Sequence, residues 1–509
     1  MVFSSTVFLF AFLPAFLAVY FIMPKRAAKN IVLLAFSLLF YAWGEPVYVW
    51  LMVFSICFNW AFGFAISKVS ESARGARKAI LVADLLLNLL ILGFYKYQGF
   101  LAENVNRAIG EEFIAELDLA LPIGISFFTL QAITYVVDVY RDQVRAQKNP
   151  LYLGMYIAMF PQLVAGPIVR YSDIEAEIDN RRATLAGFAQ GLRLFCVGLG
   201  KKVLLANTAG TLADSLLPRE AAEIGFVGCF SGVAAYTFQI YFDFSGYSDM
   251  AIGLGKMMGF EYPRNFNYPY TSKSATEFWR RWHMSLGGFF RDYVYIPLGG
   301  NRVSTPRFVA NTMIVWGLTG IWHGAAWNFV LWGLYWGALI LAEKFFIMKV
   351  LDRLPGFVSH VWCAVLFFFG WLLFAVTGLS NVAEWFCAMF GAYGFTGTST
   401  LWELQSWSYV SLIPVFIVGS LPWAPYLRKK LQAWAEGDAR RAIVAAPAKG
   451  NEAVPPCQAE LAAPAVSPAR ARAVLATNIA VDVALIAVLV LSAISVVSSS
   501  YNPFIYFQF

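Results

Sequence analysis

The sequence has little charge. Only 14% of its 509 residues are Asp, Glu, Lys or Arg, while 59% are hydrophobic and the mean hydropathy is +0.61. A chain of this composition cannot fold around one water-soluble core. Its apolar stretches also lack the short alternating segments of an outer-membrane barrel. We therefore expect an all-α fold, a polytopic integral membrane helical bundle.

Cysteine and histidine are scarce as well. The six cysteines are scattered without a CxxC pair, and most lie within apolar stretches. Neither a disulfide framework nor a zinc site is indicated, and we expect buried free thiols. With only three histidines, the sequence shows no set of metal ligands.

Apolar windows recur along the chain. About 20 residues of helix cross the roughly 30 Å hydrocarbon layer, and the pattern predicts about ten to fourteen spans or half-spans. The first window should stay as a helix, because no basic residue precedes it and no cleavage site follows it. The windows are residues 3–23, 31–54, 80–94, 151–169, 226–241, 308–341, 361–377, 410–421 and 474–497.

The net charge of +7 indicates topology rather than nucleic-acid binding, because lysines and arginines cluster in short connections. Residues 25–29, 68–78 and 141–148 are basic, whereas residues 103–118 carry mainly carboxylates. If the first basic connection is cytoplasmic, the N-terminus and the acidic connection lie outside. The basic connection at 68–78 then requires an extra half-span or re-entrant turn.

One stretch, residues 437–473, is rich in Ala, Pro and Arg. It cannot bury enough apolar area to offset the entropy of ordering, and we interpret it as a flexible cytoplasmic linker. It separates a transmembrane core, residues 1–436, from a last transmembrane helix and tail, residues 474–509.

Residues 241–301 mix aromatic residues with polar and charged ones at a density that lipid would reject. Irregular backbone at membrane depth is tolerated where it is buried in protein or lines a wet cavity. Residues 263–270 are too broken for a continuous helix, so we expect a re-entrant or cavity-lining element. Within it, Asp243 and Asp249 either orient a catalytic base or are satisfied by nearby hydroxyls.

His323 is a candidate functional residue, because ionisable residues at membrane depth are often functional. No formally charged residue lies between Arg307 and Glu343, and a neutral imidazole in such surroundings can accept a proton. The alternative is a packed histidine bonded to a carbonyl. Asn328, five positions later, is about 140° round a helix and would contact His323 only if the backbone is irregular.

His283 closes the run Trp279-Arg280-Arg281-Trp282-His283. The neighbouring arginines disfavour protonation of its imidazole. The cluster either contacts a substrate or anchors a cytoplasmic loop at the lipid headgroups. The third histidine, His360, opens an apolar helix and is interpreted as interfacial.

Several segments carry a family resemblance. The run ending at His283 continues through Phe289-Phe290-Arg291-Asp292-Tyr293 to residue 301, and Gly320-Ile321-Trp322-His323-Gly324 follows. Together they resemble the membrane-bound O-acyltransferase family, and within it the members that acetylate alginate. Residues 122–131, 160–171 and 501–509 extend the similarity over most of the chain.

The resemblance implies tilted and re-entrant helices around a central tunnel. Its cytoplasmic mouth would take an acyl donor, and the acyl group would leave at the outer face. By this similarity His323 is the catalytic histidine and His283 the second motif histidine. A histidine near neutral pKa can deprotonate a hydroxyl as it attacks a thioester.

The resemblance further implies a multi-pass protein of the bacterial inner membrane. It would move acetyl from a cytoplasmic thioester, either acetyl coenzyme A or an acyl carrier protein, for O-acetylation of an exported polysaccharide such as alginate. Periplasmic O-acetyltransferase partners would complete the transfer. No bound cofactor and no nucleic acid is expected.

The arginines of the motif are candidates for donor binding, because guanidinium matches phosphate bidentately. The equal alternative is that they anchor the loop as positive-inside residues. The candidate set for donor or substrate binding is Arg280, Arg281, Arg291, Trp282, Trp322, Asn328 and Asp243.

Two alternatives stay open. Within the family, the acceptor is peptidoglycan, cellulose or teichoic acid, the last by D-alanyl transfer. Outside it, the protein is a conduit or scaffold that moves acyl groups or polymer without chemistry. No inverted repeat is visible, which argues against a transporter.

Overall fold

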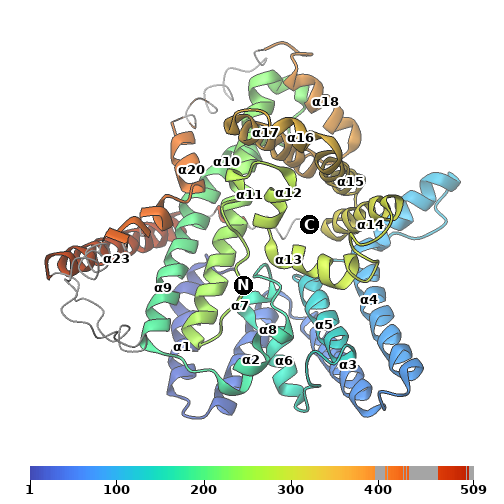
Figure 1. Cartoon of the computed structure of the whole chain (residues 1–509), viewed down its shortest axis with the longest axis vertical. Coiled ribbons are helices and arrows are strands. Elements are labelled where there is room, and N and C mark those ends of the chain that lie inside the picture. The colour runs from blue at the N-terminus through green and yellow to red at the C-terminus, as the bar shows by residue number, and fades with distance from the viewer. Residues whose placement is uncertain are drawn as a thin grey trace, which may run out of the picture.

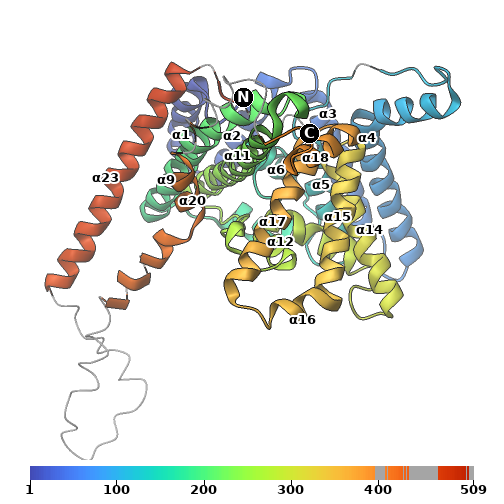
Figure 2. The ribbon, with the colours of Figure 1, turned by 90° about the horizontal axis from the view of Figure 1, so that it is seen from above.

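The computed structural model describes residues 1–117, 119–395, 468–499 and 501–503, together with part of the stretch 407–434. These residues form helices and connections, without a strand among them. Figure 2 shows the helices as a slab of tilted elements, and Figure 1 looks down through that slab onto a ring of helices. The predicted all-α bundle is confirmed.

The first part of the chain alternates between the two faces of the slab. Its elements are η1 (Phe8–Phe12), α1 (Leu13–Ile22), α2 (Arg26–Gly44), α3 (Val49–Lys68), α4 (Arg74–Ile109), α5 (Ile125–Tyr140), α6 (Pro150–Ala158), α7 (Phe160–Leu163), α8 (Tyr171–Asn180), α9 (Leu185–Gly200), η2 (Lys201–Ala206), α10 (Asn207–Leu216) and α11 (Ala221–Met258).

Short helices and then long ones follow. They are η3 (Pro269–Thr271), α12 (Ala275–Arg281), α13 (Met284–Phe289), η4 (Phe290–Tyr295), α14 (Thr305–His323), α15 (Trp327–Ala342), η5 (Glu343–Ile347), α16 (Met348–Leu351), α17 (Gly356–Ala375), α18 (Leu379–Met389), α20 (Ile413–Ser420) and α23 (Pro468–Ser498).

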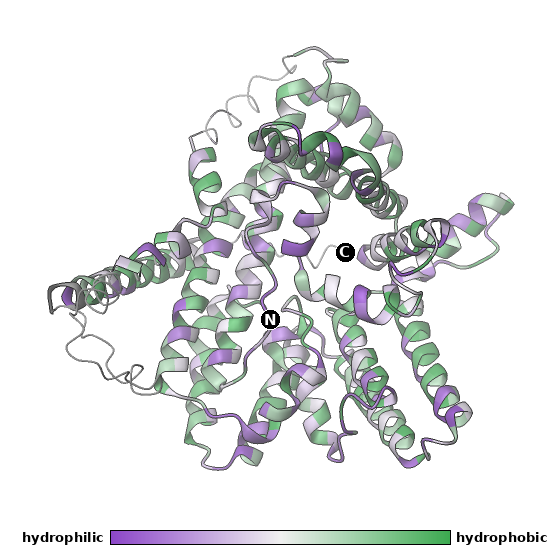
Figure 3. Cartoon of the chain, in the orientation of Figure 1, coloured by the Kyte–Doolittle hydropathy of each residue, from purple (hydrophilic) through white to green (hydrophobic). Residues whose placement is uncertain are grey.

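Seven helical segments of the described chain are long and apolar enough to span a membrane, and Phe8–Ile22 and Ile125–Tyr140 are shorter apolar helices. Most of the helical ribbon is apolar, while many connections are hydrophilic (Figure 3). This is a multi-pass membrane protein.

The extra crossing expected before residues 68–78 is present, but it is a full helix and not a half-span or re-entrant turn. The single apolar window 31–54 is two helices, α2 and α3, because the chain turns at Glu45 and Pro46, and proline cannot continue the ladder of α2. With this added crossing, the connections at 23–25, 69–73 and 141–149 all lie on one face. We call it the basic face, and the opposite side, with residues 110–124, the acidic face.

The interpretation of residues 241–258 as irregular is wrong, because they form the end of the long helix α11. The two carboxylates in this stretch, for which nearby hydroxyls were one expected set of partners, are paired with lysines instead. Asp243 accepts an ion pair from Lys202 at 2.9 Å, and Asp249 accepts one from Lys201 at 2.7 Å. A paired carboxylate can stay inside a helix bundle at far lower cost than a lone one.

Residues 259–304, in contrast, do form the expected broken element, with short helices separated by irregular backbone. They lie at the basic face. The Tyr20 hydroxyl, at the end of α1, donates to the Met258 carbonyl at 3.1 Å, and Arg141 donates to the Asp292 carbonyl at 3.2 Å.

Most of the expected linker at 437–473 lies outside the described residues. Helix α23 begins at Pro468, within the last residues of that stretch. Figure 2 shows α23 at the edge of the bundle, where Arg193 of α9 pairs with Asp482 at 2.6 Å.

Helices α14 and α15 cross at very close range. A Cβ added to Gly320 would meet the Cα of Gly333 at 3.1 Å, and one added to Gly333 would meet the Trp316 carbonyl. Small residues let membrane helices approach in this way. The contact fixes the end of α14 that carries His323.

The topology predicts opposite accessibility for two matched cysteine variants. Glu112→Cys, on the acidic face, should react with a membrane-impermeant maleimide in right-side-out vesicles. Glu71→Cys, on the basic face, should react only in inside-out vesicles. Labelling of the parent protein, with its native cysteines, sets the background. Equal labelling of both variants from one side would contradict the alternation of α1 to α5.

Candidate active site

The motif run is carried by the short helix α12, whose N-terminus is held by two side chains. The Ser274 hydroxyl accepts from the Glu277 amide at 3.0 Å, and the buried Glu343 carboxylate accepts from the Ala275 and Thr276 amides at 2.7 and 3.1 Å. A carboxylate at a helix N-terminus satisfies amides that have no partner within the helix. Glu343 thus fixes α12 against α15.

His283 follows α12 in a left-handed backbone conformation with φ of 43°. Such a conformation is strained for a residue other than glycine and persists only when its surroundings hold it. Asn265 provides that support. Its carbonyl accepts from the Met284 amide at 2.9 Å, and its side-chain oxygen accepts from the Ser285 amide at 3.2 Å.

The same Asn265 side chain determines which nitrogen of His283 carries the proton. Because Asn265 Oδ1 accepts from the Ser285 amide, it is an acceptor toward His283 Nδ1, 3.1 Å away. Nδ1 therefore carries the hydrogen, and Nε2 carries a lone pair. Nε2 is buried without a hydrogen-bond partner. His283 is thus an oriented imidazole with a free basic nitrogen.

His323 is the last residue of α14 and is 6% exposed. Its imidazole packs edge-on against the rings of Trp332 and Phe374, with ring centroids 4.9 and 5.2 Å away. No group among the described residues hydrogen-bonds to this imidazole. The interpretation of a histidine packed against a carbonyl therefore finds no bond to support it.

A cavity of about 720 Å³ opens beside His283. Its volume suits a small-molecule ligand. Tryptophans form part of its wall, and arginines of the basic face surround it. Its lining includes Trp279, Trp282, Trp316, Thr319, His283, Arg170, Arg264, Arg280 and Arg291.

This basic-face cavity carries excess positive charge. Arg170 and Arg291 share one carboxylate, that of Asp292, at 2.7 and 2.6 Å. The hydrogen bonds from Arg291 and then from Arg170 hold the pKa of Asp292 below its ordinary value. No carboxylate in the described part of the chain pairs with Arg264 or Arg280. Phosphate is the kind of group that such a rim would attract.

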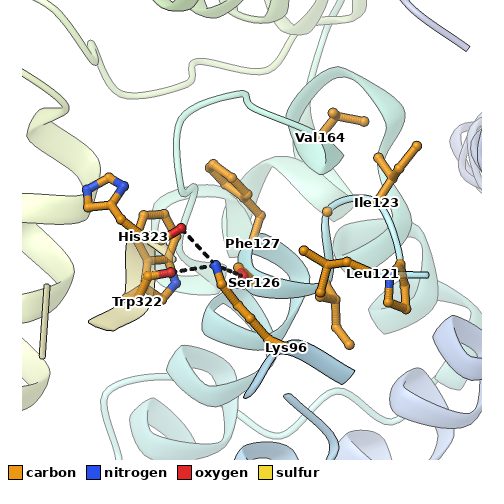
Figure 4. A pocket seen from close by; sticks show the side chains of 11 residues that line it. Lys96, Leu121, Ile123, Ser126, Phe127, Val164, Trp322 and His323 are labelled. Carbon is orange, nitrogen blue, oxygen red and sulfur yellow. Dashed lines mark hydrogen bonds between the residues drawn. The ribbon is translucent and has the colours of Figure 1, made fainter. Parts of the chain in front are cut away.

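A second, smaller pocket lies toward the acidic face. Its lining comes from α4, the 121–124 connection, the start of α5 and the end of α14, and Figure 4 shows it from close by. The Lys96 ammonium donates to the carbonyls of Trp322 and His323 at 2.6 and 3.1 Å. In Figure 4 the His323 imidazole points away from Lys96, so the backbone of His323 lines this pocket.

The two hollows approach each other along α14. The basic-face cavity reaches Thr319, and the acidic-face pocket begins at Trp322 and His323. One helical turn, about 6 Å, separates Thr319 from His323. Between them the ring of Trp322 lies 6.3 Å from that of His283 and 4.9 Å from that of His323. The two histidines are therefore brought to the same point from different parts of the chain.

His323 contributes to both sides of this junction. Its backbone lines the acidic-face pocket, while its imidazole packs on Trp332. The Trp332 ring in turn contacts Trp279 and Trp316, which line the basic-face cavity, at 5.3 and 6.4 Å.

Three residues of the predicted set line neither hollow. Arg281 pairs with Glu277 and donates to Thr271. Asn328 is buried at the start of α15 and donates to the Leu373 carbonyl at 3.3 Å, without contact to His323. Asp243 pairs with Lys202. The interfacial His360 lies 3.3 Å from the Ser272 carbonyl through Nδ1.

The sequence analysis missed Asn265 and Lys96. Lys96 had a usable signal, because it is a lysine that follows closely on the apolar window 80–94, and a charge at such depth is a functional candidate. Asn265 had only its place in the broken segment 263–270. Its contact with His283 depends on a fold-back that spacing does not reveal.

The chain is similar in sequence to known acyltransferases. The chain is 36% identical over 514 residues to "Probable alginate O-acetylase AlgI" of Azotobacter vinelandii, covering 100% of both chains. It is 36% identical over 532 residues to the protein of the same name from Pseudomonas aeruginosa, again covering 100% of both. It is also 37% identical over 376 residues to "Peptidoglycan O-acetyltransferase" of Helicobacter pylori, covering 68% of this chain and 70% of that protein.

The sequence model of the membrane-bound O-acyltransferase family matches residues 84–392, which include both histidines and most of both linings. Together with full-length similarity to acetylases, this match makes the protein an acyltransferase. The chain belongs to the membrane-bound O-acyltransferase family.

Proposed function

We propose that this protein takes acetyl from a cytoplasmic thioester and delivers it across the bacterial inner membrane for O-acetylation of an exported polysaccharide, most specifically alginate. The observation that carries the proposal is the approach of two hollows, from opposite faces, to one turn of α14. The acceptor follows from the names of the full-length relatives.

In this proposal the imidazole of His323 takes the proton from the acceptor hydroxyl. The hydroxyl oxygen forms a bond to the thioester carbonyl carbon, the carbon–sulfur bond breaks, and the leaving thiolate receives the proton from the imidazolium. General-base assistance contributes roughly a hundred- to ten-thousandfold in rate. The rings of Trp332 and Phe374 around the imidazole keep water from hydrolysing the thioester.

His283 acts at the donor end in the same scheme. Its Nε2 lies beside the basic-face cavity, and Asn265 fixes its orientation. Arg280 and Arg264, at the rim, would hold the phosphate of the donor arm. Acetyl coenzyme A and an acetylated carrier protein share that phosphopantetheine chemistry. The hydroxyl that attacks at His323 belongs either to the polymer itself or to a periplasmic O-acetyltransferase partner, which then passes the acetyl group to the polymer.

Peptidoglycan is the second candidate acceptor, because one relative is named for it. That similarity covers 68% of this chain, whereas the similarity to the alginate acetylases covers all of it. Cellulose and teichoic acid D-alanylation remain outcomes that the following experiment separates, whereas membership of an acyltransferase family argues against a conduit without chemistry.

Removing the imidazole of His323 should abolish transfer and spare the fold. In a deletion strain, we expect wild type to restore acetyl esters on the exported polymer and His323→Ala to lower them by roughly a hundredfold or more. Ester content of alginate, cellulose, peptidoglycan and teichoic acid is measured separately, with membrane abundance checked by blot. Full restoration by His323→Ala at equal abundance would mean that the imidazole of His323 is not the catalytic base.

Releasing His283 from its partner should also impair transfer. Asn265→Ala removes the acceptor at Nδ1 and the support for the left-handed backbone, and we expect a loss of about a hundredfold in ester content, as for a misplaced catalytic group. Asn267→Ala, two positions along the same segment, is the matched control. Normal esters in Asn265→Ala at equal abundance would mean that the orientation of His283 does not matter.

Substitutions of two neighbouring arginines should have different effects on donor binding. Arg280 lines the cavity, whereas Arg281 is held by Glu277 and Thr271. A hydrogen bond to a charged group contributes about 1.5–3 kcal/mol, so Arg280→Gln should raise the donor KM at least about tenfold. Arg281→Gln should leave the donor KM unchanged. Inside-out vesicles are assayed with acetyl coenzyme A and with acetylated carrier protein, and equal KM for both variants would remove Arg280 from the donor site.

A further inference from the structure

Residues of α4 bind the end of α14 through hydrogen bonds and a ring contact. Residues spaced by about one helical turn on α4 all contact the segment 321–327, and residues three and four apart share a helix face. The four contacts are Lys96 with the Trp322 and His323 carbonyls, Tyr97 with the Ile321 carbonyl at 2.7 Å, Phe100 with the Trp327 ring at 5.7 Å, and Asn104 with the Trp327 indole nitrogen at 2.8 Å.

The carbonyls at the end of α14 need these partners. The last four carbonyls of a helix have no amide within the helix to accept from. Water normally satisfies them, but in the interior of a membrane protein they depend on other groups of the chain. Tyr97 and Lys96 satisfy the last three carbonyls of α14, those of Ile321, Trp322 and His323.

Lys96 has no donor left for a ligand. An ammonium has three hydrogens, and they point to the carbonyls of Trp322 and His323 and to the Ser126 hydroxyl, which is 3.4 Å away (Figure 4). No carboxylate in the described part of the chain pairs with Lys96. Its charge is compensated by the negative end of the α14 dipole and by the Trp322 ring, 5.8 Å away.

The contacts from α4 hold the backbone both at His323 and shortly after it in the sequence. Lys96 holds its carbonyl, and Phe100 and Asn104 hold Trp327, the first residue of α15. On the other side of the backbone the imidazole is enclosed by Trp332 and Phe374. With backbone and ring both fixed, the position of the imidazole depends on α4 as well as on its own helix.

We propose that Lys96 is a positioning residue for His323, which it serves by binding the end of α14 so that the imidazole is held for proton transfer. This inference rests on the proposed role of His323. Lys96 donates to the backbone of the histidine and uses its three hydrogens within the chain, so its effect is indirect. A displacement of a reacting group by about 1 Å can cost roughly a hundredfold in rate.

The test compares Lys96→Met with Lys96→Arg in the full-length protein. Methionine keeps an unbranched side chain but leaves two buried carbonyls without a donor, whereas arginine keeps the charge and the donors. In the complemented deletion strain, we expect Lys96→Met to lower polymer acetyl esters at least about tenfold and Lys96→Arg to restore most of them. Membrane abundance and thermal stability in detergent are measured for each variant.

Lys256→Met is the matched control. Lys256 pairs with the exposed Glu261 at the basic face, away from both hollows, and this variant should keep normal esters. Tyr97→Phe, which removes a single bond to the Ile321 carbonyl, should give a smaller loss than Lys96→Met. It also keeps the inference testable if Lys96→Met does not accumulate.

The outcomes separate this inference from the function on which it rests. If His323→Ala abolishes esters while Lys96→Met retains them at normal abundance, the positioning role is wrong and the catalytic role stands. If His323→Ala retains esters, both are wrong. If Lys96→Arg is as inactive as Lys96→Met although both are abundant and stable, a cationic donor to the α14 carbonyls does not position His323, and the proposal fails.

Discussion

The structure depends on satisfying backbone groups inside a membrane, where water cannot do so. Each helix that ends within the bundle leaves amides or carbonyls to be bonded by other parts of the chain. Glu343 does this for the start of α12, Asn265 for the segment after His283, and Lys96 for the end of α14. These three side chains come from distant segments, and each one fixes a piece of backbone beside a hollow.

The same constraint explains why the hollows do not join openly. A helix end buried in protein needs dense packing around it, and aromatic rings provide that packing here. Phe127 lies 5.6 Å from Trp322, and Phe244 lies 4.6 Å from His283. Under the function proposed above, an acyl group has to pass between the two faces of the membrane without a continuous water path. Rings packed between the two hollows meet that requirement, and they also surround the two imidazoles.

Local sequence signals predicted the membrane class and the broken segment at 263–270, because hydropathy and proline act over short distances. Motif similarity gave the two histidines as candidates. These local signals gave wrong predictions where residues distant in the sequence determine the structure. Nearby hydroxyls were one expected set of partners for Asp243 and Asp249, yet Lys202 and Lys201 pair with them and α11 continues through both. The sequence predicts one span for the window 31–54, because the hydropathy of the whole window does not reveal the turn after Gly44.

The candidate site shows the same limit at the level of single side chains. Adjacent arginines of one motif have different surroundings, since Arg281 is bound to Glu277 while Arg280 lines the cavity. Two ionisable residues from different segments also differ, since Asp243 is paired by Lys202 while His283 keeps a free nitrogen. A motif therefore supplies candidates, and the partners that the fold brings to each side chain decide which of them remains available for chemistry.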